Sequence, residues 1–387
     1  MNKKLVVTAM GLVMAGAVGL ANAEVKLYGQ LDVSVNSTDS DVAADNGTRR
    51  SRKVGQDGTS YQDDINMTSN TSAVGVKGSE DLGNGLSAFF KVEWDADLVD
   101  GGNFRGRDQF IGLKMQRFGK LTFGTMSTAY KSPGSKIDAF YRTPLQSRAI
   151  GLQSNLHAGK GEEGQGRATN TVRYDSPKFF GGLSLMGTYT LDSDKQDQNV
   201  PDCDAVENCE DDDPYSLGVQ WSAGNLYVAA SWISTQASDD AEAAQFLARY
   251  NWNNLSFHGI YELDKGLITA QANNGIGQDS GALGRSRSAQ DDGADIWSVG
   301  ATFTIGNNAI GFDFGHRDNN DGVNGINDSN LIGGGTAYDD IQEYDVWRLA
   351  AYHKFSNRTR VYAGYGNTDY NHKGEDDIFA VGMRHNF

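Results

Sequence analysis

The sequence predicts an all-β protein, a 16-stranded antiparallel transmembrane β-barrel with short periplasmic turns and long external loops. Three observations support this fold. The N-terminus has the pattern of an export signal, only 38% of the residues are hydrophobic, and short and long connectors alternate along the chain. Outer-membrane barrels have an even number of strands, short turns at one end and longer loops at the other.

The first 23 residues have the three parts of a secretory signal peptide. Lys3 and Lys4 form the positive n-region, residues 5–20 are apolar, and residues 21–23 form an A-x-A cleavage site. We expect cleavage before Glu24, which leaves residues 24–387 as a single exported barrel domain. An uncleaved membrane anchor is the alternative interpretation of this segment.

The composition narrows the classes of protein further. The chain has 50 acidic and 34 basic residues, a net charge of −16 and a mean hydropathy of −0.51. The negative charge argues against a protein that binds nucleic acid, which needs a basic face. The low hydropathy excludes a bundle of transmembrane helices. A transmembrane β-barrel fits both export and low hydrophobicity, because its lipid-facing residues occupy alternate positions and its interior is polar.

Connectors of two kinds alternate along the mature chain. Seven short turns contain Gly, Asn or Pro and lie at residues 82–85, 116–119, 176–182, 222–225, 251–254, 305–308 and 355–358. Eight long polar connectors lie at residues 37–63, 96–103, 128–166, 192–213, 235–240, 264–292, 318–340 and 367–376. Fifteen connectors join sixteen strands, and strict alternation places every long connector at the same end of the barrel.

The strand segments alternate in hydrophobicity with a period of two. Ile310, Phe312 and Phe314, for example, alternate with Gly311 and Asp313. Successive side chains of a strand point to opposite faces of the sheet, so this pattern predicts one apolar face and one small or polar face. We expect the apolar face to contact lipid and the other face to line the lumen.

Several segments carry the resemblance to a known family. VGVKGSEDLGNGLSAFFKVEW at 74–94 resembles the first hairpin of Gram-negative general-diffusion porins, and the segments at 107–124 and 170–184 resemble later hairpins. The opening EVKLYGQLDVS and the closing AVGMRHNF complete a resemblance that covers the mature chain and is nearest to trimeric, OmpU-like porins. It implies that Phe387 serves as the C-terminal barrel signal.

The resemblance also implies location, partners and function. We expect a homotrimer in the outer membrane of a Gram-negative bacterium, in contact with outer-membrane lipid and lipopolysaccharide. Its water-filled channel would conduct ions and small hydrophilic solutes by passive diffusion. The resemblance implies no enzyme activity and no cofactor, and the residues themselves lead us to expect no metal and no nucleic-acid partner.

The long connector at 128–166 matches the loop that folds into the lumen in this family. The resemblance implies that Asp138 narrows the pore and presents a negative charge there, with Tyr130, Phe140 and Tyr141 as aromatic residues of the constriction. A flexible external loop is the alternative, because long loops have functions other than lining a pore.

The opposite side of the constriction is expected to be basic. Strand parity points a set of cationic side chains inward, and a charge on the lipid face costs about 2–4 kcal/mol at mid-bilayer. The expected basic pore wall comprises Arg107, Arg167, Arg173, Lys77, Arg249 and Arg348. Arg360 and Arg384, near the periplasmic end, are expected instead to form structural pairs with acidic wall residues.

The connector at 192–213 adds two expectations. It contains ten acidic residues and one lysine, so we expect it to concentrate cations and to give a mild cation preference. In an oxidising compartment its two cysteines, Cys203 and Cys209, are expected to form a local disulfide.

Other functions remain open at the level of sequence. A substrate-selective channel would need an aromatic ladder, and a surface adhesin or phage receptor would place its function in the long loops. A barrel enzyme would need a nucleophile and a base on paired strands, and no H-E-x-x-H, G-x-S-x-G or P-loop motif occurs. A secreted soluble β-protein would be extracted without detergent.

Overall fold

The computed structural model describes residues 23–40, 52–53, 60–61, 64–101, 104–158, 160–161, 166–191, 214–234, 242–268, 294–318, 343–371 and 374–387. The expected signal peptide, the disulfide and the 192–213 loop lie outside these ranges, apart from Ala23, the first residue of β1. Within the described residues, no helix has the length and apolar character needed to cross a membrane.

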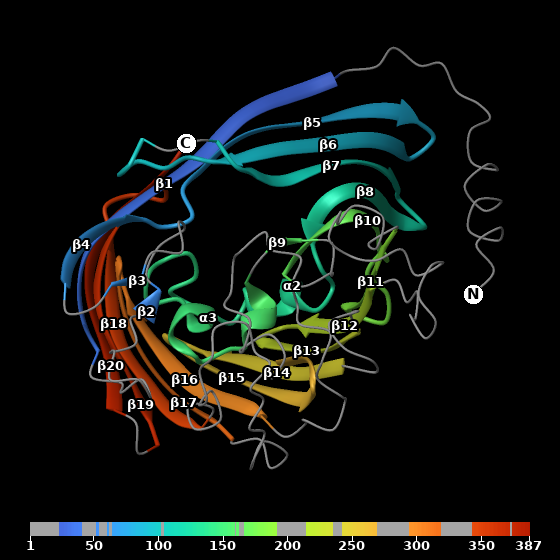
Figure 1. The fold of residues 1–387 in the computed structure, drawn as a ribbon. Coiled ribbons are helices and arrows are strands. Elements are labelled where there is room, and N and C mark those ends of the chain that lie inside the picture. Colours follow the sequence, from blue (N-terminus) through green and yellow to red (C-terminus); the bar gives the residue numbers. More distant parts are fainter. Residues whose placement is uncertain are drawn as a thin grey trace, which may run out of the picture.

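One closed antiparallel sheet forms the barrel (Figure 1). Its strands are β1 (Ala23–Ser40), β4 (Asp64–Ser69), β5 (Ala73–Gly83), β6 (Leu86–Asp95), β7 (Gly106–Met115), β8 (Gly119–Ser127), β10 (Arg167–Asp175), β11 (Leu183–Thr190), β12 (Tyr215–Ala223), β13 (Leu226–Ser234), β14 (Glu242–Trp252), β15 (Leu255–Lys265), β16 (Ile296–Ile305), β17 (Asn308–Arg317), β18 (Tyr344–Lys354), β19 (Thr359–Tyr370) and β20 (Gly374–Asn386). Both β4 and β5 pair with β1, so they are two parts of one interrupted strand. The predicted 16-stranded barrel is confirmed.

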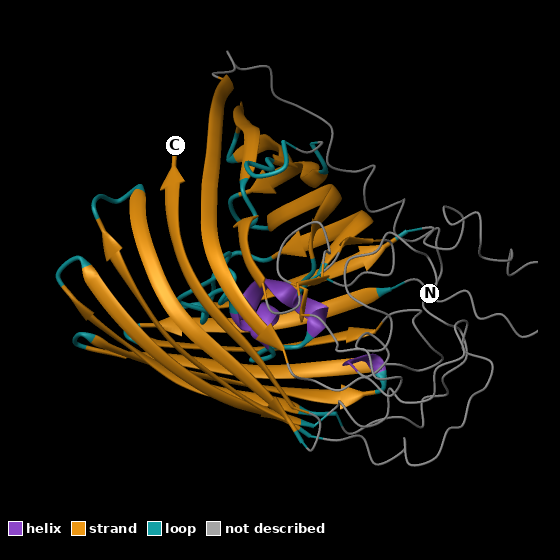
Figure 2. Cartoon of the chain, turned by 60° about the vertical axis from the view of Figure 1, so that its left-hand side comes forward, coloured by secondary structure: helices purple, strands orange, loops and turns teal. Residues whose placement is uncertain are grey.

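Shorter elements complete the described chain. These are β2 (Arg52–Lys53), β3 (Ser60–Tyr61), β9 (Lys160–Gly161), the helices α2 (Lys131–Gly134) and α3 (Ser147–Ile150), and the 3-10 helix η1 (Asn155–His157). The helices lie within the ring of strands, as Figures 1 and 2 show.

The seam between the first and last strands closes the barrel. β1 pairs with β20 from Gln30 opposite Asn386 to Ser40 opposite Asp376. These strands therefore continue beyond the limits expected from the connector pattern, because the ladder remains paired past residue 37. The backbones of Phe387 and Gly29 also exchange hydrogen bonds of 3.0 and 3.1 Å, and a Cβ at residue 29 would lie 2.3 Å from the Phe387 ring. Glycine at position 29 thus leaves the space that the C-terminal ring occupies at the seam.

The two faces of the sheet differ as the alternation predicts. Ile310 and Phe312 are 47% and 50% exposed on the outside, whereas Ala309 before them and Asp313 after them are buried. The buried apolar clusters lie inside the barrel, where residues such as Phe140 and Leu145 pack against Val346 and Ala350 of β18. Strand side chains therefore fill only part of the interior. A folded segment that packs against one part of the wall also occupies it.

Candidate functional site: the lumen and its inner loop

The segment at 128–166, hereafter the inner loop, is described except for residues 159 and 162–165. Its apolar side chains form three buried clusters with inward residues of the wall. Phe140 and Leu145 contact β18, Tyr130 and Leu156 contact β13 to β16, and Ile137 contacts β13 to β15. Burial of apolar area stabilises this packing by about 25 cal/mol per Å². We call the strands that the loop packs against, β12 to β20, the covered wall.

Side chains of the wall also bind the loop backbone. Five of them donate a hydrogen bond to a loop carbonyl: Arg249 to Lys136 (2.5 Å), Arg384 to Arg142 (2.7 Å), Ser298 to Leu152 (2.9 Å), Tyr344 to Gly151 (2.9 Å) and Thr368 to Ile150 (3.1 Å). Arg173 donates to the hydroxyl of Ser132 in the loop (2.8 Å). The first five donors satisfy carbonyls that an irregular buried backbone would otherwise leave unpaired. The wall thereby fixes the course of the loop along its length.

Asp138 lies at the centre of the strongest anchor. Its Oδ1 is 3.1 Å from Nη1 of Arg348, and Nη2 of the same guanidinium is 2.6 Å from Oδ2 of Asp313. The Asp138 carboxylate also accepts the backbone N–H groups of Phe140 and Ser147, at 2.9 and 2.8 Å. Arg348 is completely buried and lies 4.9 Å from the centre of the Phe140 ring.

This geometry differs from the role that the sequence suggested for Asp138. The side chain is 1% exposed and paired, so it does not present a free negative charge to solvent in the lumen. Arg348, expected on the basic pore wall, is likewise beneath the loop. The physical reason is that a buried carboxylate needs a partner, and the inward Arg348 provides it.

A second anchor gathers around Glu262 on β15, which is completely buried. Its carboxylate accepts hydrogen bonds from the Tyr130 hydroxyl (2.9 Å) and from the Ser154 backbone and hydroxyl, and it lies 3.3 Å from Nε2 of His157. Tyr130 therefore acts in the structure as a buried contact between loop and wall. The sequence reasoning missed Glu262, although an acid at an inward position of a strand was a usable signal.

Another part of the wall, β1 and β5 to β8, carries a different arrangement, and we call it the open wall. Arg107 is bound to Glu93 (2.7 Å) and to Asp95 (2.5 Å). Asp108 binds Lys91 at 2.7 Å and Arg167 of β10 at 2.8 Å. Among the described residues, no hydrogen bond or ion pair joins residues 129–158 to β5, β6 or β7.

A β-bulge explains why two successive residues of β7 carry inward charges. The register shifts between the pairs Val92–Gln109 and Trp94–Gly106, so β7 has one residue more than β6 at this point. An extra residue interrupts the alternation of side chains and redirects one of them. Arg107 and Asp108 can therefore both reach partners inside the barrel.

The other expected basic residues have separate partners. Lys77 is exposed and lies 4.8 Å above the ring of Tyr28 on β1. Arg173 binds Asp175 at 2.8 Å as well as the loop, and Arg249 lies 5.8 Å from the Tyr227 ring. Arg384 binds Asp32 at 2.6 Å, which confirms the expected structural pair. For Arg360 the expected acidic partner is absent among the described residues, and its guanidinium lies 5.3 Å from the Tyr352 ring.

The loop tip is cationic. Tyr141, Arg142 and Arg148 are half-buried, and both guanidiniums lie within 5.8 Å of the Tyr141 ring. Burial raises the pKa of Tyr141, but the positive charges of Arg148, Arg142, Arg107 and Arg167 outweigh this effect and lower it overall. The charge of Arg107 on the open wall therefore acts on the loop tip. The sequence reasoning identified Tyr141 but missed both arginines.

Lys131 is a further buried cation in the inner loop, 4% exposed. Its ammonium group has no acidic partner within 4 Å among the described residues. Burial lowers its pKa well below the ordinary value, and the nearby charges of Arg148 and Arg167 act in the same direction. No group of three or more His, Cys, Asp or Glu side chains is arranged to hold a metal within the described residues.

Comparisons with known proteins agree with this architecture. A family profile described as Gram-negative porin matches residues 7–373. The chain is 26% identical over 415 residues to an outer membrane porin protein of Bordetella pertussis, with full coverage of both chains. It is 27% identical over 386 residues to major outer membrane protein P.IB of Neisseria meningitidis, with 98% of each chain covered.

Solved structures show the same fold at lower identity. Salmonella typhi OmpF in complex with daunomycin has a TM-score of 0.57 and 17% identity, with 94% of this chain and 97% of that chain covered. The trimer form of Vibrio cholerae OmpT has a TM-score of 0.55 and 16% identity, with 94% and 99% covered. Family and relatives indicate a channel rather than an enzyme. The chain belongs to the family of Gram-negative porins and is an outer-membrane channel for passive diffusion.

Proposed function

We propose that solutes cross this channel through an aperture between the loop tip and the open wall, and that the fixed charge of the aperture favours small anions. The tip contributes Tyr141, Arg142 and Arg148, and the open wall contributes the exposed Lys77 and the paired charges beside Tyr28. The absence of hydrogen bonds between residues 129–158 and β5 to β7, among the described residues, supports this position. Asp138 has no direct part in it.

The main support for the proposal is that the acids of the open wall are paired with cations, whereas some cations have no acidic partner. Three acids of the open wall, Glu93, Asp95 and Asp108, are bound to the three cations Lys91, Arg107 and Arg167. Lys77, Arg142 and Arg148 have no carboxylate within 4 Å among the described residues. Unneutralised charge in a narrow, low-dielectric opening raises the local concentration of ions of the opposite sign.

The mild cation preference expected from the sequence is the second candidate. It depended on Asp138, which is paired with Arg348, and on the acidic loop at 192–213. That loop lies outside the described residues, and its ten acids remain an argument for cation accumulation at the external mouth. The two candidates differ in which region determines the ion preference of the channel, the aperture or the external mouth.

Reversal potentials in a salt gradient distinguish them. With the double variant Arg142→Gln/Arg148→Gln, we expect the reversal potential to move towards that of a cation-preferring channel. The matched control Asp138→Asn changes a buried, paired carboxylate and should leave the reversal potential unchanged. A wild-type preference for cations that the double variant leaves unaltered would overturn the anion proposal.

We further infer that the protein assembles as a homotrimer in contact with lipopolysaccharide. The trimer form of the OmpT relative supports self-association. Heat-modifiable trimers on a gel and stepwise triple closures in planar bilayers are the expected results. Loop deletions that abolish cell or phage attachment while conductance persists would instead support the adhesin or receptor role.

A further inference from the structure

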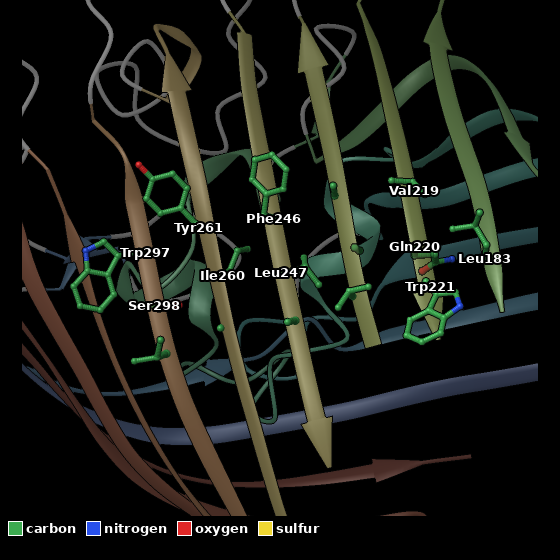
Figure 3. Close-up of a pocket in the computed structure, with 16 residues that line it drawn as sticks. Leu183, Val219, Gln220, Trp221, Phe246, Leu247, Ile260, Tyr261, Trp297 and Ser298 are labelled. Carbon is green, nitrogen blue, oxygen red and sulfur yellow. The ribbon is translucent and has the colours of Figure 1, made fainter. Parts of the chain in front are cut away.

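The outer surface of the barrel is hollowed over β11 to β16. The hollow has a volume of about 710 Å³. Figure 3 shows the rings of Trp221, Phe246, Tyr261 and Trp297 around it. Arg249, next to Ala248, binds the inner loop inside the lumen, so the alternation of side chains places Ala248 and Phe246 on the outside.

Cross-strand register explains the depression. Val228, Ala248, Gly259 and Val299 are successive partners across β13 to β16. On one side of this row, Phe246 is opposite Tyr261, and on the other side Tyr250 is opposite Phe257. Two small residues thus lie between two rows of rings, and Ala230, opposite Phe246, widens the floor. Directly opposite side chains lie about 5 Å apart, so Phe246, Tyr261 and Trp297 form a ridge along one side of the hollow, and Tyr250 and Phe257 lie just beyond its other side.

The hollow has a definite depth in the membrane. Ala248 is four residues from the end of β14 at Trp252, and Gly259 is four residues from the start of β15 at Leu255. At about 3.3 Å per residue, the floor lies about 13 Å along the strand from the short turn, and less in height because the strands tilt. Short turns are periplasmic and the apolar band is about 25 Å tall, so the floor lies in its periplasmic half.

The chemistry of the lining identifies the occupant. The outward residues of the hollow are aliphatic or aromatic, and none is charged. A second hollow of about 400 Å³ on β16 to β20 includes Asn308 and His353 and is more polar. An apolar concavity facing the hydrocarbon of a membrane is filled by lipid, since water would lack hydrogen-bond partners there.

We propose that the hollow over β11 to β16 is a binding site for one acyl chain of a phospholipid from the periplasmic leaflet. The chain lies over Ala248 and Gly259, between the two rows of rings. Its headgroup remains at the periplasmic interface, where the tyrosine and tryptophan side chains near the short turns lie. Lipopolysaccharide occupies the other leaflet, so its acyl chains enter at the opposite end of the barrel.

Filling the floor tests the proposal. Ala248→Leu places a branched side chain in the hollow without touching the lumen. Ala244→Leu is the matched control, because Ala244 faces outward on the same strand but does not line the hollow. Each variant and the wild type is delipidated in detergent and incubated with palmitoyl-oleoyl phosphatidylethanolamine or with rough lipopolysaccharide. Native mass spectrometry counts the lipids retained, and bilayer conductance verifies the folded channel.

We expect Ala248→Leu to retain phosphatidylethanolamine at least fivefold less than the wild type, with lipopolysaccharide binding and conductance unchanged. Ala244→Leu should match the wild type. Equal phosphatidylethanolamine retention by Ala248→Leu and the wild type would overturn the site. A loss of lipopolysaccharide alone would assign the hollow to the other leaflet, and dissociation into monomers caused only by Ala248→Leu would assign it to a subunit contact; either result contradicts the proposal.

Discussion

The covered wall and the open wall use the same residue types for different purposes. On the covered wall, Arg348 and Arg249 bind the inner loop, and Arg348 is completely buried. On the open wall, Arg107 and Lys91 bind acids of their own wall, while Lys77 remains exposed. An inward arginine therefore identifies the lumen but not its role there. The role depends on whether the loop covers it.

The largest expected effect lies on the covered wall, at Arg348. Arg348→Met leaves two buried carboxylates, Asp138 and Asp313, without their cation. Removing one partner of a buried pair typically costs about 3–5 kcal/mol, so we expect a loss of that size in the free energy of unfolding, measured in urea. The loss of the loop anchor should also increase current noise in single channels.

A variant that removes all three charges distinguishes the contribution of ion pairing to stability from that of packing. Asp138→Asn/Asp313→Asn/Arg348→Met removes all three charges and should recover most of the stability. If the triple variant is as unstable as Arg348→Met alone, packing against Phe140 rather than ion pairing holds the loop.

Glu262 provides a second test of the covered wall. Glu262→Gln keeps the shape of the side chain but removes the charge that faces Tyr130, Ser154 and His157. Leaving buried donors poorly paired costs about 1–3 kcal/mol. We expect faster proteolysis of the inner loop and a matching loss of stability. Glu242→Gln, a change of a half-buried acid on neighbouring β14 that does not contact the loop among the described residues, should have neither effect, and equal proteolysis of the two variants would contradict the anchor.

Much of the fold could be predicted because it depends on local patterns. The turn at 305–308 and the alternation around Phe312 are readable from neighbouring residues, and they suffice to count strands and assign faces. Closure of the barrel then follows, since an unpaired edge does not persist in a membrane.

The site depends on contacts that the sequence does not encode locally. Asp138 and Arg348 are 210 residues apart, and Tyr130 and Glu262 are 132 apart. Parity correctly places Arg348 inside but carries no information on what covers it. The bulge at Arg107 and Asp108 breaks the parity rule itself, so strict alternation would have sent one of these charges to the lipid.

Lys131 permits a test by pH. Its pKa in the folded protein lies well below 10.5, so between the two values the unfolded state binds more protons and stability rises with pH. The slope reaches about 1.4 kcal/mol per pH unit. The difference in unfolding free energy between wild type and Lys131→Met should therefore change in favour of the wild type as the pH rises towards 10.5. A difference that is flat over that range would show that the ammonium group is solvated.

The smallest effect on stability is expected at Lys77 on the open wall. Lys77→Gln removes an exposed charge that lies over the Tyr28 ring, and such substitutions change stability by about 0.5 kcal/mol or less. Because no acid neutralises Lys77 among the described residues, the same substitution should still move the reversal potential towards cation preference. Arg249→Gln on the covered wall should do the reverse, with a loss of stability and little change in reversal potential. If both variants changed stability and selectivity alike, the distinction between the two walls would not hold.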